Sequence, residues 1–128
     1  MTSPTVESRR RRRFILLSTD DTLAAALRAA LPEGWEMVVT DDVDTLGGFA
    51  EILQHRFILL DLEDRALDPL AAIAHLRRDL MLNVAIFCLG GSQELRDSAR
   101  LARADRFFER TEAAQRMQQF CTQYGWGA

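Results

Sequence analysis

The chain of 128 residues contains no lysine, so all 16 of its basic residues are arginine. This absence excludes phosphate-loop nucleotide binding, because that loop places a lysine ammonium on the phosphates. Long apolar runs are also missing, and none approaches the roughly 20 residues that a helix needs to span a bilayer. The run Arg9–Arg13 precedes only a short apolar stretch. It is therefore not the start of a signal peptide.

Cysteine is scarce as well. Cys88 and Cys121 lack the close spacing of metal ligands and lie in apolar surroundings, which favours small buried thiols in a reducing compartment. The formal net charge is −3, and removing the five positive charges of residues 9–13 leaves −8 for the rest. We therefore expect a cytoplasmic protein with an acidic body, and nucleic acid is an unlikely partner.

Short apolar segments recur along the chain and indicate a sheet of five strands. The strands are expected at residues 14–19, 35–40, 56–61, 84–89 and 105–108. The first, third and fourth lack alternation, as in FILL and VAIFCL. Continuous apolar strands of this kind are typical of a parallel sheet that is covered on both faces.

Helical patterns fill the gaps between these strands. Apolar residues from Leu23 onward fall at helical spacing, and Pro32 ends that helix. Asp68 followed by Pro69 is a cap residue with a first-turn proline, so the third helix is expected at residues 69–78.

The sequence signals for the other three helices differ in strength. Ser92 is expected to cap the fourth helix, and the fifth is expected between Thr111 and Gly125. The second, near residues 44–54, is the weakest because two adjacent glycines interrupt it. Strands alternating with helices predict an α/β fold: a doubly wound, five-stranded parallel sheet of the flavodoxin-like (βα)5 kind, with helices on both faces.

Acidic residues follow two strands of this predicted sheet. Asp20 and Asp21 come after the first strand, and Asp61 ends the third. Sites of parallel α/β sheets lie at the carboxyl ends of the strands, so we expect the three carboxylates to converge there. Three carboxylates about 4 Å apart repel by about 4 kcal/mol per pair, unless a cation relieves them. Hard oxygen ligands of this kind suit Mg²⁺ or Mn²⁺.

Each acid also has a purely structural interpretation. Asp20 or Asp21 can cap the first helix, and the pair Asp41–Asp42 shows that acidic strand ends recur in this chain. If a metal is bound, however, one carboxylate is placed to attack a phosphoryl group and form an acyl phosphate. The pattern therefore indicates phosphoryl chemistry at this edge of the sheet.

This pattern resembles the receiver domain of two-component response regulators over residues 13–124. The resemblance implies that Asp61 is the phosphoacceptor. It further implies that Asp20, Asp21, Asp61 and the backbone carbonyl of Glu63 hold Mg²⁺. On this basis the receiver-like domain is expected to span residues 13–128, after a disordered basic tail at residues 1–12.

Two further positions match the receiver pattern, whereas others depart from it. Asp68 resembles the acid before the third helix, and Phe107 the aromatic residue of the fifth strand whose rotamer reports activation. Cys88 stands where the family has serine or threonine, and its thiol is only a weak donor. Arg110–Thr111 stands where the family has Lys-Pro, and a planar guanidinium is not equivalent to an ammonium. Cys88, Arg110 and Phe107 would form the phosphate-pairing and switch residues.

Two functions follow from these residues. The first is an atypical bacterial receiver that accepts a phosphoryl group on Asp61 and signals through partner binding or dimerisation, with Arg110 pairing with the phosphate. The alternative is a pseudo-receiver, a protein-interaction module that works without phosphorylation. Neither is an enzyme beyond self-phosphorylation and autodephosphorylation. A Mg²⁺-dependent phosphohydrolase is disfavoured, because the DLE segment at residues 61–63 lacks a second aspartate.

The resemblance also implies partners. A receiver takes its phosphoryl group from a sensor histidine kinase or a phosphotransfer protein, and no membrane partner is expected. Residues 96–116 carry six arginines among four acids. This fourth-helix to fifth-helix face is a candidate homodimer interface, and an ordinary solvated surface explains its charges equally well.

Overall fold

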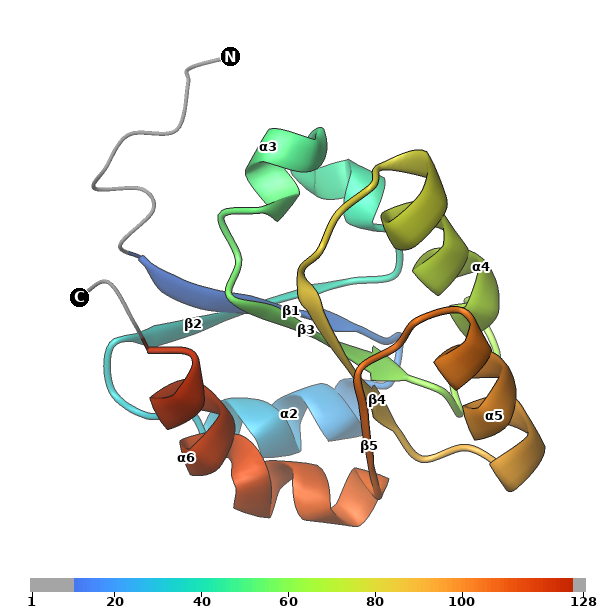
Figure 1. The fold of residues 1–128 in the computed structure, drawn as a ribbon. Coiled ribbons are helices and arrows are strands. Elements are labelled where there is room, and N and C mark those ends of the chain that lie inside the picture. Colours follow the sequence, from blue (N-terminus) through green and yellow to red (C-terminus); the bar gives the residue numbers. More distant parts are fainter. Residues whose placement is uncertain (1–10, 126–128) are drawn as a thin grey trace.

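In the computed structural model, which describes residues 11–125, five parallel strands form one sheet in the order β2-β1-β3-β4-β5 (Figure 1). The strands are β1 (Arg12–Leu17), β2 (Trp35–Thr40), β3 (Phe57–Asp61), β4 (Ala85–Leu89) and β5 (Arg106–Phe108). β3 is buried throughout, as its unbroken apolar sequence predicts. The expected α/β fold is confirmed, with each predicted strand present within two residues of its expected bounds.

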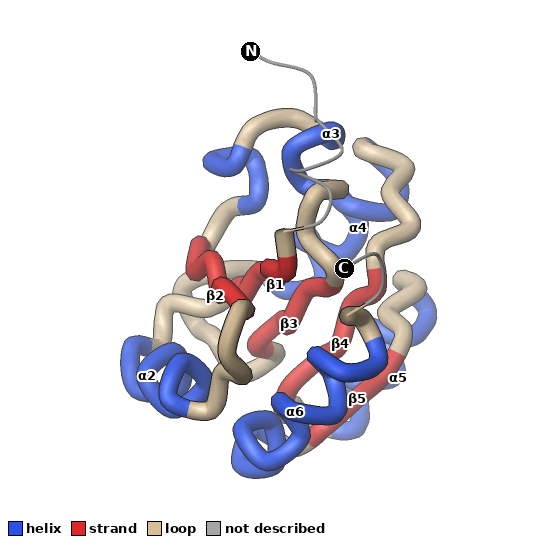
Figure 2. The backbone as a smooth tube through the Cα atoms, turned by 90° about the vertical axis from the view of Figure 1, so that its left-hand side faces the viewer, coloured by secondary structure: helices blue, strands red, loops and turns tan. Residues whose placement is uncertain are grey.

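Helices cover both faces of the sheet (Figures 1 and 2). α2 (Asp21–Ala29) and α6 (Ala113–Gln123) lie on one face, and α3 (Phe49–Ile52), α4 (Pro69–Ala74) and α5 (Gln93–Leu101) lie on the other. The predicted caps are present: the Asp68 side chain accepts a hydrogen bond from an amide of α4, and Ser92 does so for α5.

Each face of the sheet has its own apolar core. One core packs alternate residues of the strands, such as Phe14, Phe57 and Phe87, against α2 and α6. The other packs residues of opposite parity, such as Ile15 and Ile58, against α3, α4 and α5. This division follows from the period of two in a strand, which sends successive side chains to opposite faces.

Three segments differ from their expected form. The weak second helix is a 3₁₀ turn, η1 (Val43–Leu46), followed by the short α3, because Gly47 takes a φ of 119° between them. The third helix continues past α4 as a π turn, η2 (His75–Asp79). A 3₁₀ turn, η3 (Arg110–Glu112), precedes α6.

The described part of the chain begins next to the first strand. β1 begins at Arg12, one residue before the expected start of the domain, and Arg11 before it pairs with Glu36 at 2.7 Å. Residues 1–10, most of the predicted tail, lie outside the described residues. Over the part that is described, no helix is long and apolar enough to cross a membrane.

Candidate functional site at the carboxyl edge of the sheet

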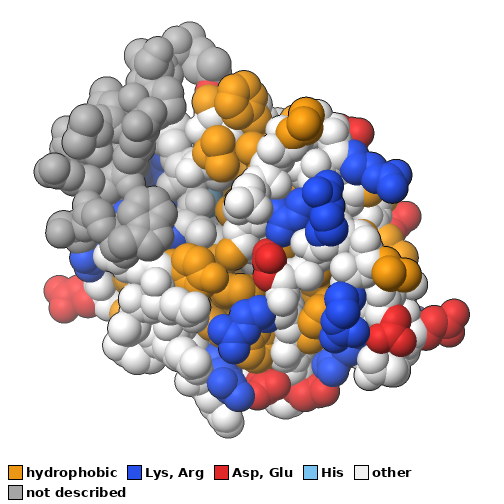
Figure 3. Space-filling view, in the orientation of Figure 1, with side chains coloured by type: hydrophobic (Ala, Val, Ile, Leu, Met, Phe, Trp, Pro, Cys, Tyr) orange, Lys and Arg blue, Asp and Glu red, His pale blue; other side chains and the backbone are white. Residues whose placement is uncertain are grey.

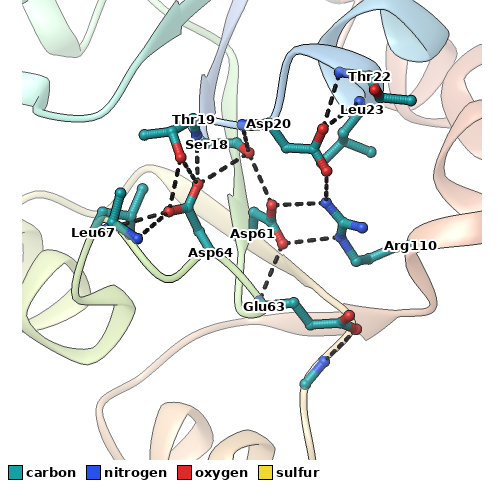
Figure 4. A network of polar contacts seen from close by, with 12 residues as sticks. Ser18, Thr19, Asp20, Thr22, Leu23, Asp61, Glu63, Asp64, Leu67 and Arg110 are labelled. Atoms are coloured by element: carbon teal, nitrogen blue, oxygen red, sulfur yellow. Dashed lines mark hydrogen bonds and ion pairs between the residues drawn. The ribbon is translucent and has the colours of Figure 1, made fainter.

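Asp61, the last residue of β3, lies at the centre of a polar network at the carboxyl edge of the sheet (Figure 4). Its side chain is 0 % exposed. The Ser18 hydroxyl donates to Oδ2 at 2.8 Å, and the Glu63 amide donates to Oδ1 at 3.1 Å. A carboxylate buried this fully requires compensation of its charge.

Arg110 supplies that compensation. Its Nε donates to Oδ1 of Asp61 and its Nη2 donates to Oδ2, both at 3.0 Å, so the guanidinium grips the carboxylate as a two-pronged fork. The same Nη2 donates to Oδ2 of Asp20 at 2.6 Å. Arg110 reaches Asp61 from the turn after β5, on the far side of β4 from β3. It therefore ties three loops together.

These contacts shift the ionisation of the partners. The hydrogen bonds that Arg110 donates to Asp61 and then to Asp20 raise the pKa of Arg110. The hydrogen bond from Arg110 lowers the pKa of Asp20, aided by the amide of Leu23. Asp20 is the N-cap of α2 and accepts through Oδ1 from the amides of Thr22 at 2.9 Å and Leu23 at 3.2 Å. The helix-cap interpretation of Asp20 is thus confirmed.

The three carboxylates do not converge as expected. Asp21 is exposed in the first turn of α2 and makes no hydrogen bond or ion pair within the described residues. Ser18 and Thr19 separate the end of β1 from the acidic pair, so Ser18 faces Asp61 while Asp21 falls inside the helix. Within residues 11–125, no group of three or more His, Cys, Asp or Glu side chains is placed to hold a metal ion.

The residues present therefore do not fit the expected Mg²⁺ or Mn²⁺. The space between Asp20 and Asp61 is occupied by a guanidinium, which contacts both carboxylates. Glu63 turns its carboxylate away from Asp61, accepting from the Gly91 amide at 3.1 Å. A cationic side chain and a metal ion would compete for the same oxygens.

Asp64 is a third aspartate of the network, and the sequence alone did not single it out as a site residue. Both of its oxygens accept from the Thr19 hydroxyl, at 2.9 and 3.0 Å, and Oδ1 also accepts from the amides of Ala66 and Leu67. Burial acts to raise the pKa of Asp64, but these hydrogen bonds and one from the Thr19 amide lower it to about 2. Asp64 thus ties the β1–α2 loop to the β3–α4 loop.

Of the three predicted phosphate-pairing and switch residues, Arg110 joins the network, whereas Cys88 and Phe107 lie outside it. Cys88 is fully buried in the core, and burial raises the pKa of its thiol to about 12, so it offers no reactive thiolate. Phe107 is half-buried against the same core, with the Arg100 guanidinium 4.7 Å from its ring centre. Cys88 therefore places a buried thiol, and no hydroxyl, at the position in β4 where the resemblance expects serine or threonine.

No protein-family model matches the sequence, and no curated protein matches it. Solved structures do match its fold. The phosphorylated cyanobacterial phytochrome response regulator RcpA shares 13% identity at a TM-score of 0.69, over 92% of this chain and 96% of that one. Response regulator RPA3017, from red light signalling in R. palustris, shares 13% at a TM-score of 0.71, over 91% and 96%. The Mn²⁺-bound form of response regulator Rcp1 shares 13% at a TM-score of 0.65, over 87% and 92%.

Proposed function

Because the chain has the fold of response-regulator receiver domains, we propose that it is a signalling module that works through protein contact, without phosphoryl transfer at Asp61. The two-pronged contact of Arg110 with Asp61 is the observation that carries this proposal. Of the two functions that the sequence suggested, the geometry favours the pseudo-receiver.

The nucleophile is the first reason. A carboxylate has about four acceptor sites. On Asp61 each oxygen already accepts two hydrogen bonds: Oδ1 from Glu63 and Arg110, and Oδ2 from Ser18 and Arg110. An attacking oxygen must present a lone pair to phosphorus, so one of these contacts must first break.

The counterion is the second reason. Transfer of a phosphoryl group needs positive charge on its oxygens, and a divalent ion normally supplies it. Here the positive charge between Asp20 and Asp61 belongs to Arg110 and is covalently tethered. The charge of Asp61 is therefore balanced from within the chain, and the loops of the site are joined in one arrangement without a ligand.

Phosphorylation of Asp61 remains the competing proposal, and one observation favours it. The Arg110 side chain is 27 % exposed, so it has room to turn toward a phosphoryl group supplied by a histidine kinase or phosphotransfer protein. In that case Arg110 would pair with the phosphate, and Mg²⁺ would bind where the guanidinium now lies.

Intact-mass measurement after incubation with acetyl phosphate and Mg²⁺ separates the two proposals. We expect no phosphoryl adduct on the parent chain or on Asp61→Asn, and no Mg²⁺-dependent rise in melting temperature. The matched variant Ser18→Asp/Arg110→Lys makes two changes. It replaces the hydroxyl next to Asp61 with a carboxylate, and it replaces the planar guanidinium of Arg110 with an ammonium group. An adduct on this variant alone would show that Arg110 and Ser18 block the reaction, whereas an adduct on the parent would refute the proposal.

Homodimerisation through the α5–α6 face stays a prediction. Arginines on this face are paired within the chain: Arg96 with Glu109 at 2.8 Å, Arg100 with Asp97 at 3.2 Å, and Arg116 with Glu112 at 3.4 Å. Exposed pairs of this kind contribute at most about 1 kcal/mol each and are open to exchange with a partner's charges. Reversal of charge in Arg100→Glu should weaken self-association in sedimentation equilibrium if the face is used.

A further inference from the structure

We propose that a groove between α4–η2 and α5 binds a short protein segment in which an aliphatic side chain is flanked by carboxylates. The groove has a volume of about 330 Å³ and is lined by Ala74, Arg78, Ser98, Leu101, Ala102 and Arg103. It involves the carboxyl-terminal parts of both helices, which begin near the carboxyl edge of the sheet and run away from it (Figure 1). The groove is therefore a separate surface from the Asp61 network.

The floor of the groove is made of small side chains. Ala74, Ser98 and Ala102 leave space between the two helices for one aliphatic group from outside. Leu101 stands at the groove with 87 % of its surface exposed. Met81, on the loop that follows η2, is 82 % exposed. These are the two most exposed large apolar side chains of the described residues, and an apolar partner in the groove would shield Leu101, which lines it, from water.

The rim of the groove is positively charged, and its charge is unmatched. Arg78 is exposed and has no carboxylate partner among residues 11–125. The Arg103 side chain donates one hydrogen bond, to a neutral acceptor, the carbonyl of Arg77, at 3.2 Å. On the neighbouring α5–α6 face, by contrast, Arg96, Arg100 and Arg116 each have a carboxylate within 3.4 Å. The groove arginines are thus available to carboxylates of a partner.

The backbone holds these side chains outward at a cost. Met81 has a φ of 53° and Arg103 a φ of 80°, in the left-handed region that disfavours residues with a Cβ. Neither side chain is buried, so core packing does not explain why a non-glycine residue stands there. Both residues close the end of a helical segment: the Leu82 amide donates to the Leu76 carbonyl at 2.9 Å and the Ala104 amide to the Ala99 carbonyl at 3.0 Å, and glycine is the usual residue at such an end.

Arg77 fixes both strained loops from the interior. Its buried guanidinium donates to the carbonyls of Arg103 at 3.0 Å, Leu82 at 2.9 Å and Val84 at 2.8 Å, and pairs with Asp105 at 2.8 Å. One side chain therefore sets the position of the loop after η2 and the loop after α5. The surface is rigid before a partner arrives, which lowers the entropy lost on binding.

The surroundings favour a protein segment over a nucleic acid or an anionic membrane. In Figure 3, arginines and apolar side chains alternate over the ends of α4 and α5, with acidic side chains beside them. The exposed carboxylates of Glu94 and Asp97 on α5 and of Asp105 before β5 would repel a continuous polyanion. A short peptide places its few carboxylates on Arg78 and Arg103 and its aliphatic group in the groove.

Selection from a displayed library of random peptides tests this proposal directly. We expect enriched peptides to combine acidic and aliphatic residues, and their amide shift perturbations to map to Ser98, Leu101 and Arg103 in NMR spectra. Binding should fall at least tenfold in Arg78→Glu and in Ser98→Trp, which fills the groove. The control Arg28→Glu, an exposed arginine on α2, should bind like the parent.

Arg103→Gly keeps the test valid if other variants fold poorly. Glycine relieves the left-handed backbone and removes the cation, so this variant should melt at a higher temperature yet bind enriched peptides at least fivefold more weakly. Failure to enrich acidic–aliphatic peptides, or binding unchanged in all three groove variants, would overturn the proposal. So would tighter binding, lost in the same variants, to phosphatidylserine vesicles or to a single-stranded oligonucleotide.

Discussion

The carboxyl edge of the sheet and the groove between α4–η2 and α5 differ in whether their charged side chains are paired within the chain. At the edge, Asp61 is fully buried and each of its oxygens is occupied by donors of the same chain. At the groove, Arg78 is exposed and without a carboxylate partner in the described structure. A site whose polar groups are satisfied internally binds a ligand only by giving up contacts, whereas an unsatisfied surface gains contacts when it binds.

The two regions also differ in how they use arginine. Arg110 is tied to two acids and holds loops together, while Arg77 is buried and holds the loops that present Met81 and Arg103. Arg110 thus fills the space between two acids at the carboxyl edge, and Arg77 fixes the loops beside the groove.

Removal of the guanidinium at the edge should have the largest effect. In Arg110→Ala, Asp61 stays buried without its countercharge, and we expect a loss of about 3–5 kcal/mol in the free energy of unfolding at pH 7. Urea denaturation monitored by circular dichroism measures it. Arg28→Ala, which removes an exposed arginine from α2, is the control and should change stability by less than about 0.5 kcal/mol.

The double variant Arg110→Ala/Asp61→Asn tests the cause of that loss. Because the amide carries no charge to compensate, we expect the double variant to be more stable than Arg110→Ala alone. Additive losses, with no coupling between the two positions, would show that the contact does not stabilise the edge.

Replacement of Gly90 by alanine should cause the next largest loss of stability. Gly90 has a φ of 73°, and an added Cβ would overlap the Glu63 carboxylate and lie 2.9 Å from Cγ of Arg110. Gly90→Ala should therefore cost about 2–3 kcal/mol, from backbone strain and from displacement of both side chains. Gly34→Ala is a matched control, because Gly34 has a φ of 86° but open space around it. It should lose only about 1 kcal/mol, and equal losses would argue against the overlap.

The fold was predictable from the sequence, because periodicity and caps are local signals. Asp68–Pro69 and Ser92 marked their helices correctly. The site was predicted less well, since its geometry depends on where β1 ends: two further residues after Leu17 put Ser18 against Asp61 and Asp20 at a helix cap. The contact between Arg110 and Asp61 joins residues 49 positions apart, and no local pattern encodes it.

Titration of His75 should make the free energy of unfolding depend on pH. Its Nε2 lies 2.8 Å from Asp44 of η1 and its Nδ1 lies 2.9 Å from Asp79 of η2, and Asp44 first, then Asp79, raises the pKa of His75 above 6.5. Asp41, Asp42 and Asp68 line the same pocket as His75. A raised pKa means that the stabilisation is complete below pH 6.5 and is lost as pH rises through the folded-state pKa.

Urea midpoints measured between pH 5.5 and 8.5 should show this loss in the parent and not in His75→Gln. His55 provides a contrast, because burial and then Arg13 lower its pKa to about 4. Its neutral form is favoured in the folded state, so its contribution is present above pH 6.5 and declines as pH falls below that value. A slope between pH 6.5 and 8.5 that survives in His75→Gln would assign the effect to another group.

The smallest predicted change is a gain of stability at the groove. Arg103→Gly relaxes a backbone with a φ of 80°, which costs about 1–2 kcal/mol for a residue with a Cβ, but glycine also increases the entropy of the unfolded chain. We expect a net gain of up to about 1 kcal/mol in urea denaturation. Arg106→Gly, in β5, is the control and should lose stability, since it has no strain of this kind to release. A loss of stability in Arg103→Gly as large as that of the control would contradict this prediction. It would show that the hydrogen bond from Arg103 to the Arg77 carbonyl contributes more than the backbone strain costs. The contrast between the satisfied edge and the strained groove would then no longer hold.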